Sequence, residues 1–112
     1  MNKIPCSVYI VTLNCGAWLE RTLQSVSEFD EVIILDSGST DNTYEIAKRF
    51  ENTQISHQDW QGYAGQKSLA LAKCRNDWVL NLDGDEVLSN ELKQEIVETI
   101  QQNKLDALIT PI

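Results

Sequence analysis

The sequence predicts an α/β fold with a mostly parallel, doubly wound sheet and helices on both faces. Short apolar segments rich in β-branched residues alternate with segments of helical periodicity, and polar residues follow directly after the apolar ones. Such alternation is typical of parallel strands joined by helices. The chain has 112 residues and no repeat or linker, so we expect a single domain spanning residues 1–112.

The first half of the chain is expected to form two strands, each followed by a helix. Residues 7–13 and 31–35 are apolar with little alternation, as in strands that are covered on both faces. Between them, apolar residues recur at helical spacing. The apolar face of this first helix consists of Leu19, Leu23 and Val26. Ser39 or Thr40 is expected to cap the second helix.

The second half is expected to add strands at residues 54–57, 78–82 and 107–110. A helix capped by Ser89 should lie between the last two, because apolar residues recur there at a spacing of four. A loop and then a helix should join the first two. The loop contains Trp60, Gly62 and Gly65, and the helix runs through Leu69 and Ala72.

Composition excludes several classes of protein. The net charge of −8 and the scattered Lys and Arg residues argue against a nucleic-acid surface. No apolar run is long enough to span a bilayer, and residues 1–5 lack a signal core, which predicts a cytoplasmic protein. Cys6, Cys15 and Cys74 lack metal-ligand spacing and are expected to be reduced thiols, with Cys6 and Cys74 in or beside apolar segments.

Polar residues follow three of the predicted strands: Thr12 and Asn14, then residues 36–39, and then residues 83–86. Ligands of doubly wound sheets bind beyond the carboxyl ends of the strands. We therefore expect the three clusters to meet at one edge of the sheet, in an arrangement that suits a nucleoside diphosphate.

The cluster Asp83-Gly84-Asp85-Glu86 is the most informative of the three. Like charges at the exit of a buried strand repel one another, and a bound cation relieves that repulsion. Carboxylate oxygens are the ligands that Mg²⁺ or Mn²⁺ prefers, usually together with substrate phosphates. The alternative is a polar turn followed by the solvated start of a helix.

These segments together resemble the inverting family 2 glycosyltransferases with the GT-A fold. The resemblance extends from about residue 7 to the C-terminus and covers the nucleotide-binding half of such an enzyme. Its more specific part resembles enzymes that extend lipopolysaccharide cores, often as β-1,4-glucosyltransferases. The matching segments, in order, are Thr12-Leu13-Asn14, residues 32–41 (VIILDSGSTD), Gly65-Gln66-Lys67 and residues 82–86 (LDGDE).

The resemblance implies a role for each matching residue. Thr12, Asn14 and Ser37 would lie along the nucleotide, and Asp36 would accept a hydrogen bond from the uracil N–H. Lys67 would contact the diphosphate or the base, with Gln66 beside it. Asp85 would be the main metal ligand, Asp83 would lie near the ribose and the metal, and Glu86 would support them. From the residues alone, Asp36 is equally a turn residue that bonds its own backbone, and Lys67 an exposed helix residue.

The resemblance also implies an activity and its partners. Such an enzyme transfers a sugar from a UDP-sugar to a saccharide or lipopolysaccharide-core acceptor with inversion, and Mg²⁺ or Mn²⁺ stabilises the leaving diphosphate. In this family the catalytic base follows further along the chain, beyond Ile112. We therefore expect UDP binding without sugar transfer. Association with the cytoplasmic face of the inner membrane through the missing part, and self-association, are further expectations.

Two other classes of protein remain as alternatives. A receiver-like signalling domain would use Asp36 as its phosphate acceptor, although its acidic pair should follow the first strand, where this chain has Asn14 and Cys15. A noncatalytic nucleotide-binding module would use the same sheet. A dinucleotide-binding domain is disfavoured, because no glycine-rich turn follows the first strand. His57 and Trp60 could act as a proton carrier or a sugar platform, but a single His without an acidic or cysteine partner is more often structural or exposed. The tryptophans at positions 18 and 78 are interpreted as core residues.

Overall fold

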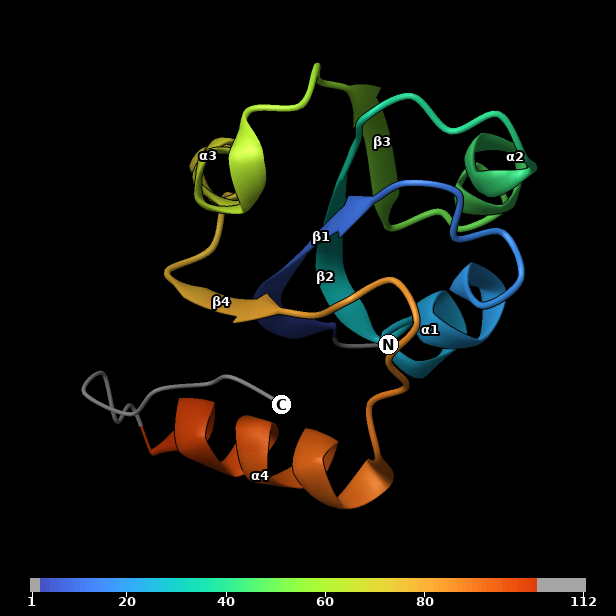
Figure 1. Cartoon of the computed structure of the whole chain (residues 1–112). Helices are drawn as coiled ribbons and strands as arrows, with labels where there is room; N and C mark the ends of the chain where they lie inside the picture. The colour runs from blue at the N-terminus through green and yellow to red at the C-terminus, as the bar shows by residue number, and fades with distance from the viewer. Residues whose placement is uncertain (1–2, 103–112) are drawn as a thin grey trace.

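The computed structural model describes residues 3–102, which form a four-stranded sheet flanked by helices (Figure 1). Strands and helices alternate along the chain, which confirms the predicted α/β fold. The expected strand at residues 107–110 lies outside the described residues. The elements are β1 (Ile4–Thr12), α1 (Leu19–Ser25), β2 (Phe29–Asp36), α2 (Thr43–Ala47), β3 (Thr53–His57), α3 (Gly62–Ala72), β4 (Trp78–Asn81) and α4 (Asn90–Gln101).

The strands lie in the order β3-β2-β1-β4, and all neighbouring pairs are parallel. Helices α1 and α2 cover one face of the sheet, and α3 covers the other (Figure 1). The chain moves from β1 outward to β3 and then returns across the sheet to β4. The direction in which successive strands are added to the sheet therefore reverses between β1 and β4, which makes this the switch point of the strand order. In doubly wound sheets, ligands bind at the switch point, outside the carboxyl ends of the strands.

The two central strands carry the core. In β2 every residue from Glu31 to Asp36 is buried, because helices cover both faces of the sheet at this strand. This explains why the sequence of the strand is a continuous apolar run without alternation. The largest fully buried apolar side chains include Phe29, Ile10, Leu19, Leu23, Ile34, Leu35, Leu80 and Leu82.

The start of α2 differs from the prediction. Neither Ser39 nor Thr40 caps this helix, which begins only at Thr43. The Ser39 hydroxyl donates to Asp36 instead, and the backbone N–H of Thr43 donates to the Asp41 carboxylate at 3.0 Å. The prediction was wrong because the side chains of the β2–α2 turn bond one another before the helix starts.

The loop before α3 is shorter than predicted. Gly62 is the first residue of α3 and Gly65 lies within it, so only Trp60 of the three predicted loop residues precedes the helix. Gly62 has a φ of +82°, a left-handed conformation that suits glycine. The predicted cap of α4 is confirmed, since the Ser89 hydroxyl accepts a hydrogen bond from the Leu92 N–H at 3.1 Å.

Candidate functional site

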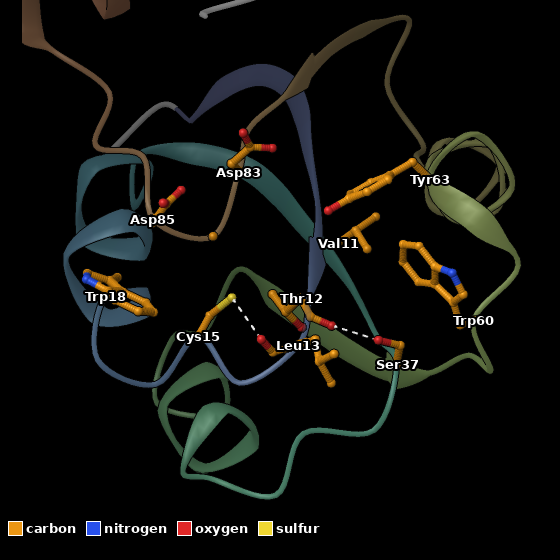
Figure 2. Close-up of a pocket in the computed structure, with 11 residues that line it drawn as sticks. Val11, Thr12, Leu13, Cys15, Trp18, Ser37, Trp60, Tyr63, Asp83 and Asp85 are labelled. Atoms are coloured by element: carbon orange, nitrogen blue, oxygen red, sulfur yellow. Dashed lines mark hydrogen bonds between the residues drawn. The ribbon is translucent and has the colours of Figure 1, made fainter.

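A pocket of about 620 Å³ lies at the carboxyl edge of the sheet, between the ends of β1 and β4 (Figure 2). Thr12, Ser37, Asp83 and Asp85 all line it, so the predicted meeting of the three polar clusters at one edge is observed. The pocket is therefore at the switch point of the strand order. The remaining lining residues are Val11, Leu13, Cys15, Trp18, Trp60, Tyr63 and Gly84.

Asp36 lies beneath this edge, and its side chain is completely buried. Thr12 Oγ1 and Ser39 Oγ donate to Oδ1, while the N–H groups of Gly38 and Ser39 donate to Oδ2 at 2.9 and 2.7 Å. Burial raises the pKa of Asp36, but these hydrogen bonds together outweigh it and hold the pKa below its usual value. A buried carboxylate with four donors is a poor phosphate acceptor, which argues against the receiver alternative.

Asn14 joins the loop after β1 to the loop after β2. Its side-chain oxygen accepts hydrogen bonds from the N–H groups of Thr40 at 2.8 Å and Asp41 at 3.3 Å. Its own N–H donates to Ser39 Oγ at 2.7 Å. Asn14 has a φ of +53°, a conformation that asparagine adopts more readily than most residues. The Asn14 side chain therefore holds the two loops together, and it is not among the residues that line the pocket.

The acidic loop after β4 is closed by its own last residue. The Asp83 N–H donates to Glu86 Oε1 at 2.7 Å, and the Glu86 N–H donates to the Asp83 carbonyl at 3.0 Å. The side chains of Asp83 and Asp85 are exposed at the pocket and make no hydrogen bond or ion pair with any residue from 3 to 102. Glu86 thus shapes the turn, while Asp83 and Asp85 face the pocket without a partner from the described chain.

These two carboxylates are a suitable donor set for a divalent cation that also binds phosphate. Within residues 3–102, no three His, Cys, Asp or Glu side chains are grouped so that they could hold a metal by themselves. A Mg²⁺ site typically needs only one or two carboxylates, because substrate phosphates and water supply the other ligands. The oxygen chemistry of Asp83 and Asp85 therefore fits Mg²⁺ or Mn²⁺ in the presence of a phosphate ligand.

Aromatic side chains form two walls of the pocket. Figure 2 shows Trp18 on one side, and Trp60 with Tyr63 on the opposite side, where the two rings are perpendicular with centroids 5.0 Å apart. The prediction that Trp18 belongs to the core was wrong. It is 53% exposed, because it precedes α1 while Leu19 and Leu23 turn inward. Trp60 precedes α3 and Tyr63 is in its first turn, so helical spacing does not explain why the two rings share a wall.

Four further residues considered in the sequence do not line the pocket: Trp78, Lys67, Gln66 and His57. Trp78 is partly buried and packs against the core, as expected.

Lys67 is half-buried on α3 and is not a lining residue. Gln66 beside it is fully buried and donates to the Gln58 carbonyl at 3.4 Å, which ties α3 to the loop that carries Trp60. His57 pairs with an exposed neighbour, Asp59, at 2.7 Å.

The fold and the pocket define an α/β domain of the class that binds ligands at a switch point in the strand order. The family model "Glycosyl transferase family 2" matches residues 7–112, and the chain belongs to that family. The fold is that of the GT-A glycosyltransferases. No helix within the described part of the chain is long and apolar enough to cross a bilayer.

Two relatives illustrate the family membership. An uncharacterized glycosyltransferase of Rickettsia prowazekii is 50% identical over 97 residues, which cover 86% of this chain and 32% of that protein. The lipopolysaccharide core biosynthesis glycosyltransferase LpsC of Rhizobium meliloti is 35% identical over 102 residues, which cover 88% of this chain and 38% of LpsC. The chain thus spans about a third of the length of these relatives.

Two solved structures have the same fold. Staphylococcus aureus TarS residues 1–349 match with a TM-score of 0.75 at 24% identity, over 88% of this chain and 33% of that one. Glucosyl-3-phosphoglycerate synthase of Mycobacterium tuberculosis was solved in complex with Mn²⁺, UDP and glucosyl-3-phosphoglycerate. It matches with a TM-score of 0.70 at 26% identity, over 85% of this chain and 39% of that chain.

Proposed function

We propose that this chain is the donor-binding domain of a longer, metal-dependent glycosyltransferase that takes its sugar from a UDP-sugar and inverts the anomeric centre. One observation carries the proposal. Asp83 and Asp85 lie at the pocket without a partner among residues 3–102, whereas the carboxylates of Asp36 and Glu86 are bonded within the protein. Two carboxylates kept available at a switch point suit a divalent cation and a diphosphate.

In this proposal Asp85 is the main ligand of Mg²⁺ or Mn²⁺, and Asp83 lies beside the ribose and the metal. The bound cation would neutralise the charge that develops on the leaving UDP. The need for a cation follows from charge, because the chain carries a net charge of −8 and would otherwise repel a diphosphate. The Mn²⁺ and UDP bound together in the Mycobacterium tuberculosis synthase support this arrangement.

The nucleoside is proposed to lie along the ends of β1 and β2, against Thr12, Asn14 and Ser37. The exposed rings of Trp60 and Tyr63 offer an apolar surface at that side of the pocket. Lys67 would approach the diphosphate or the base from α3.

Asp36 would accept the uracil N–H in this proposal. All four of its lone-pair positions already have donors, so one donor has to leave. The Ser39 hydroxyl is the donor best able to do so, because its O–H can turn away from Asp36 while Oγ keeps the hydrogen bond from the Asn14 N–H, whereas the two backbone N–H groups are held by the turn.

The acceptor is proposed to be a saccharide of a lipopolysaccharide core, an assignment supported by the name of the LpsC relative. A cytoplasmic enzyme acting at the inner-membrane face fits such an acceptor. Self-association through surface that the rest of such an enzyme would cover is part of the same proposal. No residue of this chain is assigned as the catalytic base, so we expect it to bind UDP without transferring a sugar.

Thermal unfolding with UDP and Mn²⁺ or Mg²⁺, singly and together, tests the proposal. A ligand at about a hundred times its dissociation constant stabilises the folded state by about 2.7 kcal/mol. We expect that stabilisation only when UDP and metal are both present, and we expect Asp85→Ala to abolish it. Asp77→Ala is the matched control, because Asp77 is an exposed aspartate just before the opposite end of β4. No shift in the unfolding temperature, or an equal loss in both variants, would refute the proposal.

A further inference from the structure

The acidic loop is attached to α1 by two hydroxyl groups. Thr22 is fully buried and its Oγ1 donates to the carbonyl of Gly84 at 3.0 Å. Ser25 accepts a hydrogen bond from the Leu88 N–H at 3.0 Å and donates to the Thr22 carbonyl at 2.6 Å. The loop is thus fixed to α1 at its middle, and the chain is fixed to the same helix again two residues after the loop ends at Glu86, in both cases by residues more than sixty positions earlier in the chain.

Gly84 lies between the two carboxylates that face the pocket, and it is itself buried. A Cβ at this position would lie 2.8 Å from Cys15 Sγ, so the loop backbone packs directly against the turn that follows β1. A buried carbonyl needs a donor, because leaving it without one costs free energy. Within residues 3–102, Thr22 supplies that donor.

We propose that Thr22 is a positioning residue for the metal-diphosphate site, acting through the Gly84 carbonyl on Asp83 and Asp85. The inference rests on the proposed function, because it assigns the support of the same two carboxylates. Metal sites tolerate only small displacements of their ligands, and partners that hold the ligands in place commonly change metal affinity when removed. The hydrogen bond to the Gly84 carbonyl fixes the backbone from which the Asp83 and Asp85 side chains extend. The hydrogen bond from the Asp83 N–H to Glu86 closes the loop that contains both residues.

Thr22→Val tests this inference, since valine has nearly the same shape and lacks the hydroxyl. We expect the Mn²⁺ concentration for half-saturation, measured calorimetrically at saturating UDP, to rise about tenfold. Thr22→Ser should restore the wild-type value. Thr53→Val is the matched control, because Thr53 is a partly buried threonine at the start of β3 whose hydroxyl donates to Asn52 Oδ1 at 3.2 Å, at the opposite end of the sheet. That control should leave the Mn²⁺ dependence unchanged.

The outcomes separate this inference from the proposed function. If the wild-type chain shows no Mn²⁺-dependent binding of UDP, the proposed function fails. If the wild type binds and folded Thr22→Val has the same Mn²⁺ half-saturation, only the role of Thr22 is overturned. Should Thr22→Val not fold by circular dichroism, Thr22→Cys decides, because its thiol is a much weaker donor to the Gly84 carbonyl than the hydroxyl. An unchanged Mn²⁺ half-saturation in Thr22→Cys would then overturn the inference.

Discussion

Glu31, at the amino end of the sheet, is bonded within the protein, whereas Asp83 and Asp85, at the carboxyl end, have no partner among residues 3–102. At the amino end, Glu31 is only 3% exposed and accepts hydrogen bonds from Ser7 Oγ and the Arg75 N–H, both at 2.6 Å. At the carboxyl end, Asp83 and Asp85 are exposed and have no partner among residues 3–102. The first arrangement satisfies a charge within the fold, and the second leaves charges available to a ligand.

The amino end is a closed polar network. Asn76 donates from its side chain to Ser7 Oγ and to Asp30 Oδ2, both at 3.0 Å. Arg75 pairs with Asp30 at 3.3 Å and with Glu31 at 3.2 Å. The turn between α3 and β4 is thereby tied to β1 and β2, so this end should contribute to stability and the other end to binding.

Glu31→Ala is the largest expected effect on stability. It leaves the buried Ser7 hydroxyl and the Arg75 N–H without an acceptor, which should lower the free energy of unfolding by about 3 kcal/mol. Urea denaturation measures this loss. UDP binding by the molecules that remain folded should be unchanged. A loss below about 1 kcal/mol would contradict the division between the two ends.

Asn14→Ala extends the comparison to the carboxyl end. Alanine cannot accept from the Thr40 N–H and is strained at a φ of +53°, so we expect a loss of about 2 kcal/mol. Asn14→Gly removes the same side chain without that strain and should cost less. Urea denaturation of the two variants separates the hydrogen bonds from the backbone conformation. Equal losses in the two variants would show that strain in the left-handed conformation contributes nothing to the loss of stability in Asn14→Ala.

Asp36→Asn tests whether a buried carboxylate at the binding end is also structural. Its hydrogen bonds should make the variant about 1.5 kcal/mol less stable at pH 7. The pKa of Asp36 is lowered in the folded state, so the unfolded state takes up its proton first as the pH falls. Its contribution is present above about pH 4 and is lost as the pH falls through the folded-state pKa. Urea denaturation between pH 7 and pH 3 should therefore show the wild type losing its advantage over the variant.

Asp85→Asn should have the smallest effect without ligand. An exposed side chain with no partner among the described residues should change the free energy of unfolding by at most about 0.5 kcal/mol. Thermal unfolding measures the change, and in the presence of UDP and Mn²⁺ the variant should lose the ligand-induced shift. A clear loss of stability without ligand would place Asp85 with Glu31 as a structural residue.

Most of the fold could be predicted from the sequence, because the spacing of apolar residues within a segment reflects which of its faces are buried. Residues 31–35 form a central strand whose residues are buried on both faces of the sheet, as inferred from their continuous apolar run. The start of α2 and the loop before α3 could not be predicted in the same way. They depend on the hydrogen-bond partners of Ser39 and Asp41 and on the left-handed backbone conformation of Gly62, none of which follows from the spacing of apolar residues.

The candidate site was predictable only in part for a similar reason. Thr12, Ser37, Asp83 and Asp85 line the pocket because they follow strands, which is a rule of topology. Trp18 was misplaced because helical spacing does not specify the direction of a residue just before a helix. No sequence pattern indicates the role of Thr22, since its hydrogen-bond partner Gly84 lies 62 positions away.

The position of β4 has a consequence for the order in which the chain folds. Strands β1, β2 and β3 pair with one another within residues 4–57, so they can assemble early during synthesis. Until Trp78–Asn81 emerges from the ribosome, the apolar β1 is the edge of that sheet, open to pairing with another chain. Among the strands within residues 3–102, β4 is the last to be synthesised, and by pairing with β1 it protects the nascent chain from aggregation before Asp83 and Asp85 reach the pocket.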